Sequence, residues 1–223
     1  MAEKVSLNEK ELADCYAIAV STEPHDRTES AVKGQGLENH EGPKIEPLKL
    51  LMPFNGWEQE VFVPAEFVLS TILPAVEHEI GHIVAAAHFG ALIIGIGLGP
   101  ISERSTDGWF LQAVYGWEAV PVETRCIVLA AGPAADLLYR GRIDEGAASG
   151  DLNDIEGLSG TRSLEPYLDR ATELLSEYRS EIAWIAERLR AALTDGEWRH
   201  MIRLPNGRQV ALFIDEATLR DCP

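Results

Sequence analysis

The stretch AVEHEIGHIVAAAHFG, residues 75–90, places two histidines four positions apart, with a glutamate directly after the first. Residues four apart in an α-helix lie on the same face, so His78 and His82 can direct both imidazoles at one ion. This is the His-Glu-x-x-His arrangement, in which the histidines bind zinc and the glutamate accepts a proton from water. The flanking residues are apolar, and burying such polar groups is costly without partners or a metal. We therefore predict a helix with a zinc site and Glu79 as its general base; the alternative is a pair of ordinary buried histidines.

The composition is that of a globular protein. Of the 223 residues, 46% are hydrophobic, which is enough for one core of good size. The chain has 19 basic and 36 acidic residues, a formal net charge of −17, which repels nucleic acid and anionic lipid surfaces. We therefore expect no nucleic-acid partner.

The cysteines and the N-terminus both predict a cytoplasmic protein. Cys15, Cys126 and Cys222 are scattered and odd in number, so a disulfide framework is not expected. The N-terminal sequence MAEKVSLNEKELADCYAIAV lacks the charged and then apolar pattern of a secretory signal. Free thiols without an export signal fit a reducing compartment.

One uncharged window raises the possibility of a membrane span. Residues 83–102, IVAAAHFGALIIGIGLGPIS, are about long enough to cross a bilayer. From Gly90 onward, however, β-branched residues alternate with glycines, which favours a buried strand over a continuing helix. We expect the end of a helix, a turn and a strand; membrane insertion is the less favoured alternative.

Three regions follow from the distribution of charge and apolar residues. Ser6 and Glu9 form a capping-box pattern, which predicts a short N-terminal helix within residues 1–20. Residues 21–48 are rich in charge, glycine and proline and predict a flexible linker. Residues 49–223 are the predicted catalytic domain.

Within that domain, the pattern predicts a mainly helical α+β fold. A helix should begin near Pro64, with Pro74 either kinking it or opening the metal-binding helix. The strand after Gly90 should pair with 108–117 in a hairpin that covers this helix. Further expectations are a helix at 122–141, a loop at 145–163, one long helix at 165–194 in a C-terminal helical segment, and a β hairpin turning at Asn206-Gly207.

A catalytic zinc site usually has three protein ligands, so a third ligand must be found. His88 follows His78 by ten residues, but ten residues of unbroken helix rotate a side chain by about 280°, away from the first histidine. Glu103 stands 21 residues after His82, in a segment rich in turn-forming residues rather than on a helix. Neither is favoured.

The best candidate comes from a family resemblance. The motifs HEIGH, GIGLGP with WFLQAVYGW, LAAGPAAD and GAASGDLNDI follow one another in this order. In this order they resemble the peptidase domain of the FtsH-type AAA proteases, over roughly residues 64–198. The resemblance implies a zinc peptidase in which an aspartate completes the metal site. Asp151 fits that position best, and Asp154 is the alternative. Asp136 is either a helix-surface acid or a carboxylate that orients a ligand histidine.

The resemblance does not extend to the ATPase part of that family. The sequence contains no Gly-x-x-x-x-Gly-Lys-Ser/Thr phosphate loop, so we expect no ATP-driven unfolding by this chain alone. The favoured hypothesis is a zinc metallopeptidase that acts on peptides or unfolded proteins, with a separate unfoldase as a possible partner. The alternatives are a non-catalytic zinc-containing binding module and a membrane protease of the site-2 type, whose motif also runs into a glycine-rich segment.

Overall fold

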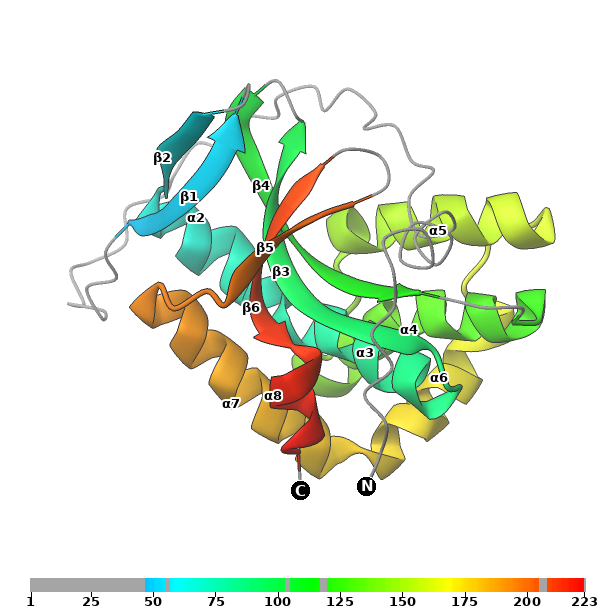
Figure 1. Ribbon diagram of the computed structural model, residues 1–223. Coiled ribbons are helices and arrows are strands. Elements are labelled where there is room, and N and C mark those ends of the chain that lie inside the picture. The colour runs from blue at the N-terminus through cyan, green and yellow to red at the C-terminus, as the bar shows by residue number, and fades with distance from the viewer. Residues whose placement is uncertain (1–46, 55–56, 103–104, 117–119, 205–207, 223) are drawn as a thin grey trace, which may run out of the picture.

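Figure 1 shows the computed structural model, which describes residues 47–54, 57–102, 105–116, 120–204 and 208–222. This part is a mainly helical α+β structure, as the sequence predicts. The predicted N-terminal helix at 1–20 lies outside the described residues, and so does the predicted linker at 21–48 except for its last two residues.

A β hairpin that the sequence analysis did not predict opens the described chain. β1 (Leu48–Phe54) pairs with β2 (Trp57–Val63) in antiparallel register. Leu50 and Val63 are completely buried, so one face of this hairpin belongs to the core. Leu48, assigned to the linker from the sequence, is already part of the first strand.

The helical segment that leads to the histidines changes geometry along its length. It begins directly after Pro64, as predicted, and Pro74 lies in a short 3-10 turn before the histidine helix. Its parts are α2 (Ala65–Phe67), the π-helical turn η1 (Val68–Ile72), the 3-10 turn η2 (Leu73–Ala75) and α3 (Val76–His88).

The predicted hairpin after α3 is present and belongs to a larger sheet. β3 (Leu92–Ser102) pairs antiparallel with β4 (Ser105–Gly116). The C-terminal hairpin, β5 (His200–Arg203) and β6 (Gln209–Asp215), joins it because β6 pairs with β3, giving the strand order β4-β3-β6-β5. Because side chains alternate along β4, Leu111 and Ala113 pack on the core with α3, and Val114 packs on the opposite face.

The helix predicted at 122–141 is α4 (Val122–Arg140), which ends at Gly141 in the left-handed conformation. The loop predicted at 145–163 is wrong, because most of it forms α5 (Glu145–Ser159). The Asp144 side chain caps this helix by accepting from the Gly146 and Ala147 amides. Glycines and acids make the helix weak by local propensity, and the burial of Ala148 and Ile155 compensates.

The single long helix predicted at 165–194 is also wrong. It is two helices, α6 (Glu165–Glu177) and α7 (Arg179–Asp195), which are separated at Tyr178. Both helices contact α3, but α6 packs mainly on α4, whereas α7 also packs on β6. The chain ends with the short α8 (Glu216–Arg220).

α3 is the central helix of the described fold. It contacts α4, α6 and α7 as well as strands β3 and β4, and Figure 1 shows the sheet lying across it. No helix among the described residues is long and apolar enough to cross a membrane, and the uncharged window at 83–102 is divided between α3 and β3.

We predict that Gly81→Ala destabilises the protein by about 1–3 kcal/mol, the usual range for overpacking a core. An added Cβ would lie 2.4 Å from the Ala131 carbonyl oxygen and 2.9 Å from the Ala135 Cβ, both on α4. Gly157→Ala on α5 is the matched control, since its Cβ meets nothing within 4 Å. It should stabilise by up to about 1 kcal/mol through helix propensity. Urea unfolding curves measure both, and equal effects would contradict close packing at Gly81.

Candidate metal centre

The fold brings His78 and His82 of α3 together with Asp151 of α5. One ligand atom from each lies within 4.8 Å of the others. His78 Nε2 is 3.2 Å from Asp151 Oδ2, and His82 Nε2 is 3.3 Å from Asp151 Oδ1. Both histidines are buried and the aspartate is nearly so. Three potential ligands therefore converge from two helices.

The outer nitrogen of each imidazole is held by an acceptor on α4. His78 Nδ1 lies 3.0 Å from Asp136 Oδ2, and His82 Nδ1 lies 2.8 Å from the Val128 carbonyl oxygen. A neutral histidine that donates from Nδ1 keeps its Nε2 lone pair for a metal, and such partners are usual around metal-bound histidines. Asp136 is completely buried, so of the two sequence alternatives the helix-surface acid is wrong.

Gly132 of α4 leaves the space that the two imidazoles occupy. A Cβ at this position would lie 2.4 Å from His82 Nε2 and 2.5 Å from His78 Nε2, closer than real side chains approach. Sequence analysis placed this glycine within LAAGPAAD without recognising its role. The signal was the glycine itself, an unfavourable residue inside a helix that usually marks a packing requirement.

These residues fit a zinc ion. Zinc is commonly bound by histidine nitrogens and carboxylate oxygens, and catalytic zinc sites have three protein ligands with one position left for water. Two Nε2 atoms and one carboxylate converge beside a glycine that leaves the space open. His78, His82 and Asp151 would hold the ion, with Asp136 and the Val128 carbonyl orienting the histidines.

The charges of His78, His82 and Asp151 shift one another's pKa values. Burial lowers the pKa of His78, but hydrogen bonds to Asp136 and Asp151 outweigh burial and raise the pKa to about 10. Burial likewise raises the pKa of Asp151, and the two histidines more than reverse this shift, so its pKa is lowered.

Asp154, the alternative third ligand, lies beside the group and is not part of it. Burial and the neighbouring charge of Asp151 raise the pKa of Asp154 to about 6. One helical turn separates the two aspartates, and Asp151 is the one whose carboxylate reaches both histidines. Glu103 falls outside the described residues.

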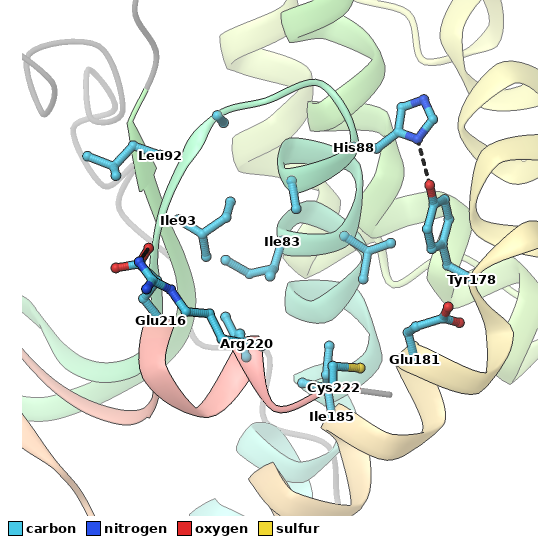
Figure 2. Close-up of a pocket in the computed structure, with 14 residues that line it drawn as sticks. Ile83, His88, Leu92, Ile93, Tyr178, Glu181, Ile185, Glu216, Arg220 and Cys222 are labelled. Carbon is cyan, nitrogen blue, oxygen red and sulfur yellow. Dashed lines mark hydrogen bonds and ion pairs between the residues drawn. The ribbon is translucent and has the colours of Figure 1, made fainter. Parts of the chain in front are cut away.

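His88 points away from the candidate metal group of His78, His82 and Asp151, as the helical rotation predicts. It is exposed, and its Nδ1 lies 2.9 Å from the Tyr178 hydroxyl, as Figure 2 shows. Both side chains border a largely apolar pocket on the face of α3 that does not carry His78 and His82. Its walls include Ile83 of α3, Ile93 of β3 and Ile185 of α7.

Glu79 lies at the junction between α3 and the sheet. Its Oε2 accepts a hydrogen bond from the Ala113 backbone amide on β4, at 2.6 Å. Burial raises the pKa of Glu79, while the two histidines and this hydrogen bond lower it, and burial prevails. Sequence analysis missed Ala113 because a backbone N–H has no side-chain signature.

Tyr115 is a second residue of β4 that sequence analysis missed. It follows Ala113 by two residues, so both side chains are on the face of the sheet that packs on α3. Burial, followed by the charges of Asp151 and Glu79, raises the pKa of Tyr115. Its hydroxyl therefore stays neutral, and a neutral phenol can donate a hydrogen bond.

Comparison with known proteins adds no assignment. No protein-family model matches the chain, and no curated protein matches it significantly.

We predict that Asp151→Asn lowers zinc affinity by more than the roughly 10–100-fold typical of losing a residue outside the ligand set. Asp154→Asn is the matched control on the same helix and should keep zinc affinity within a few-fold. Competition with a chromogenic chelator measures both. If the Asp154 change removes zinc and the Asp151 change does not, the third ligand is misassigned by one helical turn.

A second prediction concerns Asp136. Asp136→Asn should weaken zinc binding roughly 10–100-fold, because the amide is a poorer acceptor for His78 Nδ1 than the carboxylate. The exposed Asp195→Asn on α7 serves as the control. Unchanged zinc affinity in a folded Asp136→Asn protein would mean that this carboxylate does not orient the histidine.

Proposed function

We propose that this protein is a zinc-dependent metallopeptidase that hydrolyses peptide bonds with an activated water molecule. The observation that carries the proposal is the convergence of His78, His82 and Asp151, whose charges act on the buried Glu79 carboxylate. A zinc site that serves structure alone is normally closed by four protein ligands and needs no neighbouring base. Three ligands and a carboxylate are what hydrolysis requires.

A bound zinc ion would supply a Lewis acid that lowers the pKa of water toward about 7 and polarises the scissile carbonyl. The chain itself supplies the proton transfers. Glu79 accepts the proton of the attacking water and passes it to the leaving nitrogen. Asp136 and the Val128 carbonyl keep both imidazoles oriented.

The edge of the sheet suits an extended peptide. Within the described residues β4 pairs with β3 on one side only. The Ala113 N–H donates to Glu79 and therefore faces away from β3. Because backbone groups alternate along a strand, the backbone amides of Leu111 and Tyr115 also face outward. A substrate added along this edge would form backbone hydrogen bonds and lie beside Glu79.

Only extended chains can bind in this way. Opening a folded domain costs about 5–15 kcal/mol, and the sequence has no phosphate loop for an ATP-driven unfoldase. The substrates proposed here are therefore disordered peptides or proteins that a separate partner has unfolded. This agrees with the resemblance to the FtsH-type peptidase domain. We place the activity in the cytoplasm, because Cys126 and Cys222 are free thiols.

We predict slow, ATP-independent cleavage of unstructured peptides by the zinc-loaded protein, while stable globular proteins remain intact. Glu79→Gln should reduce kcat by at least about 100-fold and retain zinc, because it removes the base and neither histidine. Mass spectrometry of a disordered peptide mixture, with zinc content measured in parallel, checks both. Equal rates in the two proteins, or no cleavage by the zinc-loaded wild type, would instead favour a non-catalytic zinc-binding module.

A further inference from the structure

The general base and the sheet share one hydrogen bond. The Ala113 N–H donates to Glu79 Oε2 at 2.6 Å, from a strand at the edge of the sheet. A short N–H bond to a carboxylate is charge-assisted and stronger than one between neutral groups. The contact joins α3 to β4. It also holds the carboxylate of the proposed general base in one orientation.

The same N–H is a group that an added strand would use. An antiparallel or parallel neighbour pairs with every second residue of β4, and Ala113 is one of the residues whose amide faces outward. A single N–H cannot give full-strength hydrogen bonds to two acceptors in different directions. A substrate carbonyl and the Glu79 carboxylate therefore compete for it.

We propose that the Ala113 N–H acts as a switch: it bonds Glu79 when no substrate is present and a substrate carbonyl when a peptide is bound. This rests on the proposed function, because it assumes that the substrate binds along β4. Without substrate, the amide holds Glu79 against the sheet. When a peptide pairs with β4, its carbonyl takes the amide and the released carboxylate gains the freedom to accept a proton from water. The base is thus released only where a substrate backbone is present.

The competition has a consequence that does not require catalysis. Glu79 must be displaced before the peptide can bond Ala113, so removing the acceptor oxygen should tighten peptide binding. Glu79→Ala and Glu79→Gln both lack the charge and the base, and only Gln keeps an oxygen that can accept from the amide. The difference between these two variants isolates the hydrogen bond.

The experiment measures the affinity of a short fluorescein-labelled unstructured peptide for both full-length variants, by fluorescence anisotropy. Glu79→Ala should bind about 3–10-fold more tightly than Glu79→Gln, the size expected for one hydrogen bond of about 1 kcal/mol. Adding Ala113→Pro to each variant should abolish the difference. Proline removes this amide without breaking a bond to β3, because the amide points outward at a strand edge.

Hydrogen exchange of the Ala113 amide gives a readout that needs no peptide. Exchange should be faster in Glu79→Ala than in Glu79→Gln, and the added peptide should slow it in both. Equal peptide affinities, with binding intact, would overturn the switch and leave the peptidase proposal standing. Absence of peptide binding in every variant would overturn both. An Ala113 amide that exchanges equally in the wild type and in Glu79→Ala would show that Glu79 does not hold it.

Discussion

The rest of the site depends on the hydrogen bonds and the ion pair of the buried Asp136 carboxylate. Its Oδ2 lies 3.0 Å from His78 Nδ1 and accepts from the Asp144 backbone amide at 3.1 Å, and Oδ1 lies 3.4 Å from Arg140. A buried carboxylate is stable only with such partners. Because Asp144 caps α5, the carboxylate that orients one histidine also positions the start of the helix that carries Asp151. Both helices that carry the candidate ligands are therefore contacted through one side chain.

Close packing of α3 against α4 makes that arrangement possible. Gly81 and Gly132 lie where the two helices meet, and at either position a Cβ would collide with the opposite helix. Each glycine costs about 1 kcal/mol of helix propensity relative to alanine. The approach lets Val128 and Asp136 reach the histidines with a backbone oxygen and a short side chain.

Three faces of α3 contact three different parts of the structure. One face presents the histidines to α4 and α5, a second presents Glu79 to the edge of the sheet, and the back lines the pocket shown in Figure 2. In the proposed peptidase, ligand geometry belongs to the helices and substrate pairing to β4. The Glu79 contact with Ala113 is the direct link between the two layers.

The sequence by itself determined what depends on local spacing. Two histidines at i and i+4 lie on one helix face wherever that helix is, and the hairpin after Gly90, α4 and the pairing of β5 with β6 follow from periodicity and turn residues. The predicted turn residues Asn206-Gly207 lie outside the described residues. Tertiary structure decided what depends on contacts distant in the chain. α5 forms because Asp144 caps it and Ile155 is buried. The predicted long helix is divided at Tyr178 into α6, which packs mainly on α4, and α7, which packs on α3 and β6, and β6 joins β3 across more than a hundred residues. The reach of Asp151 rather than Asp154 to the histidines, and the Ala113 amide at Glu79, are likewise set by packing, because neither has a local pattern that the chain alone could reveal.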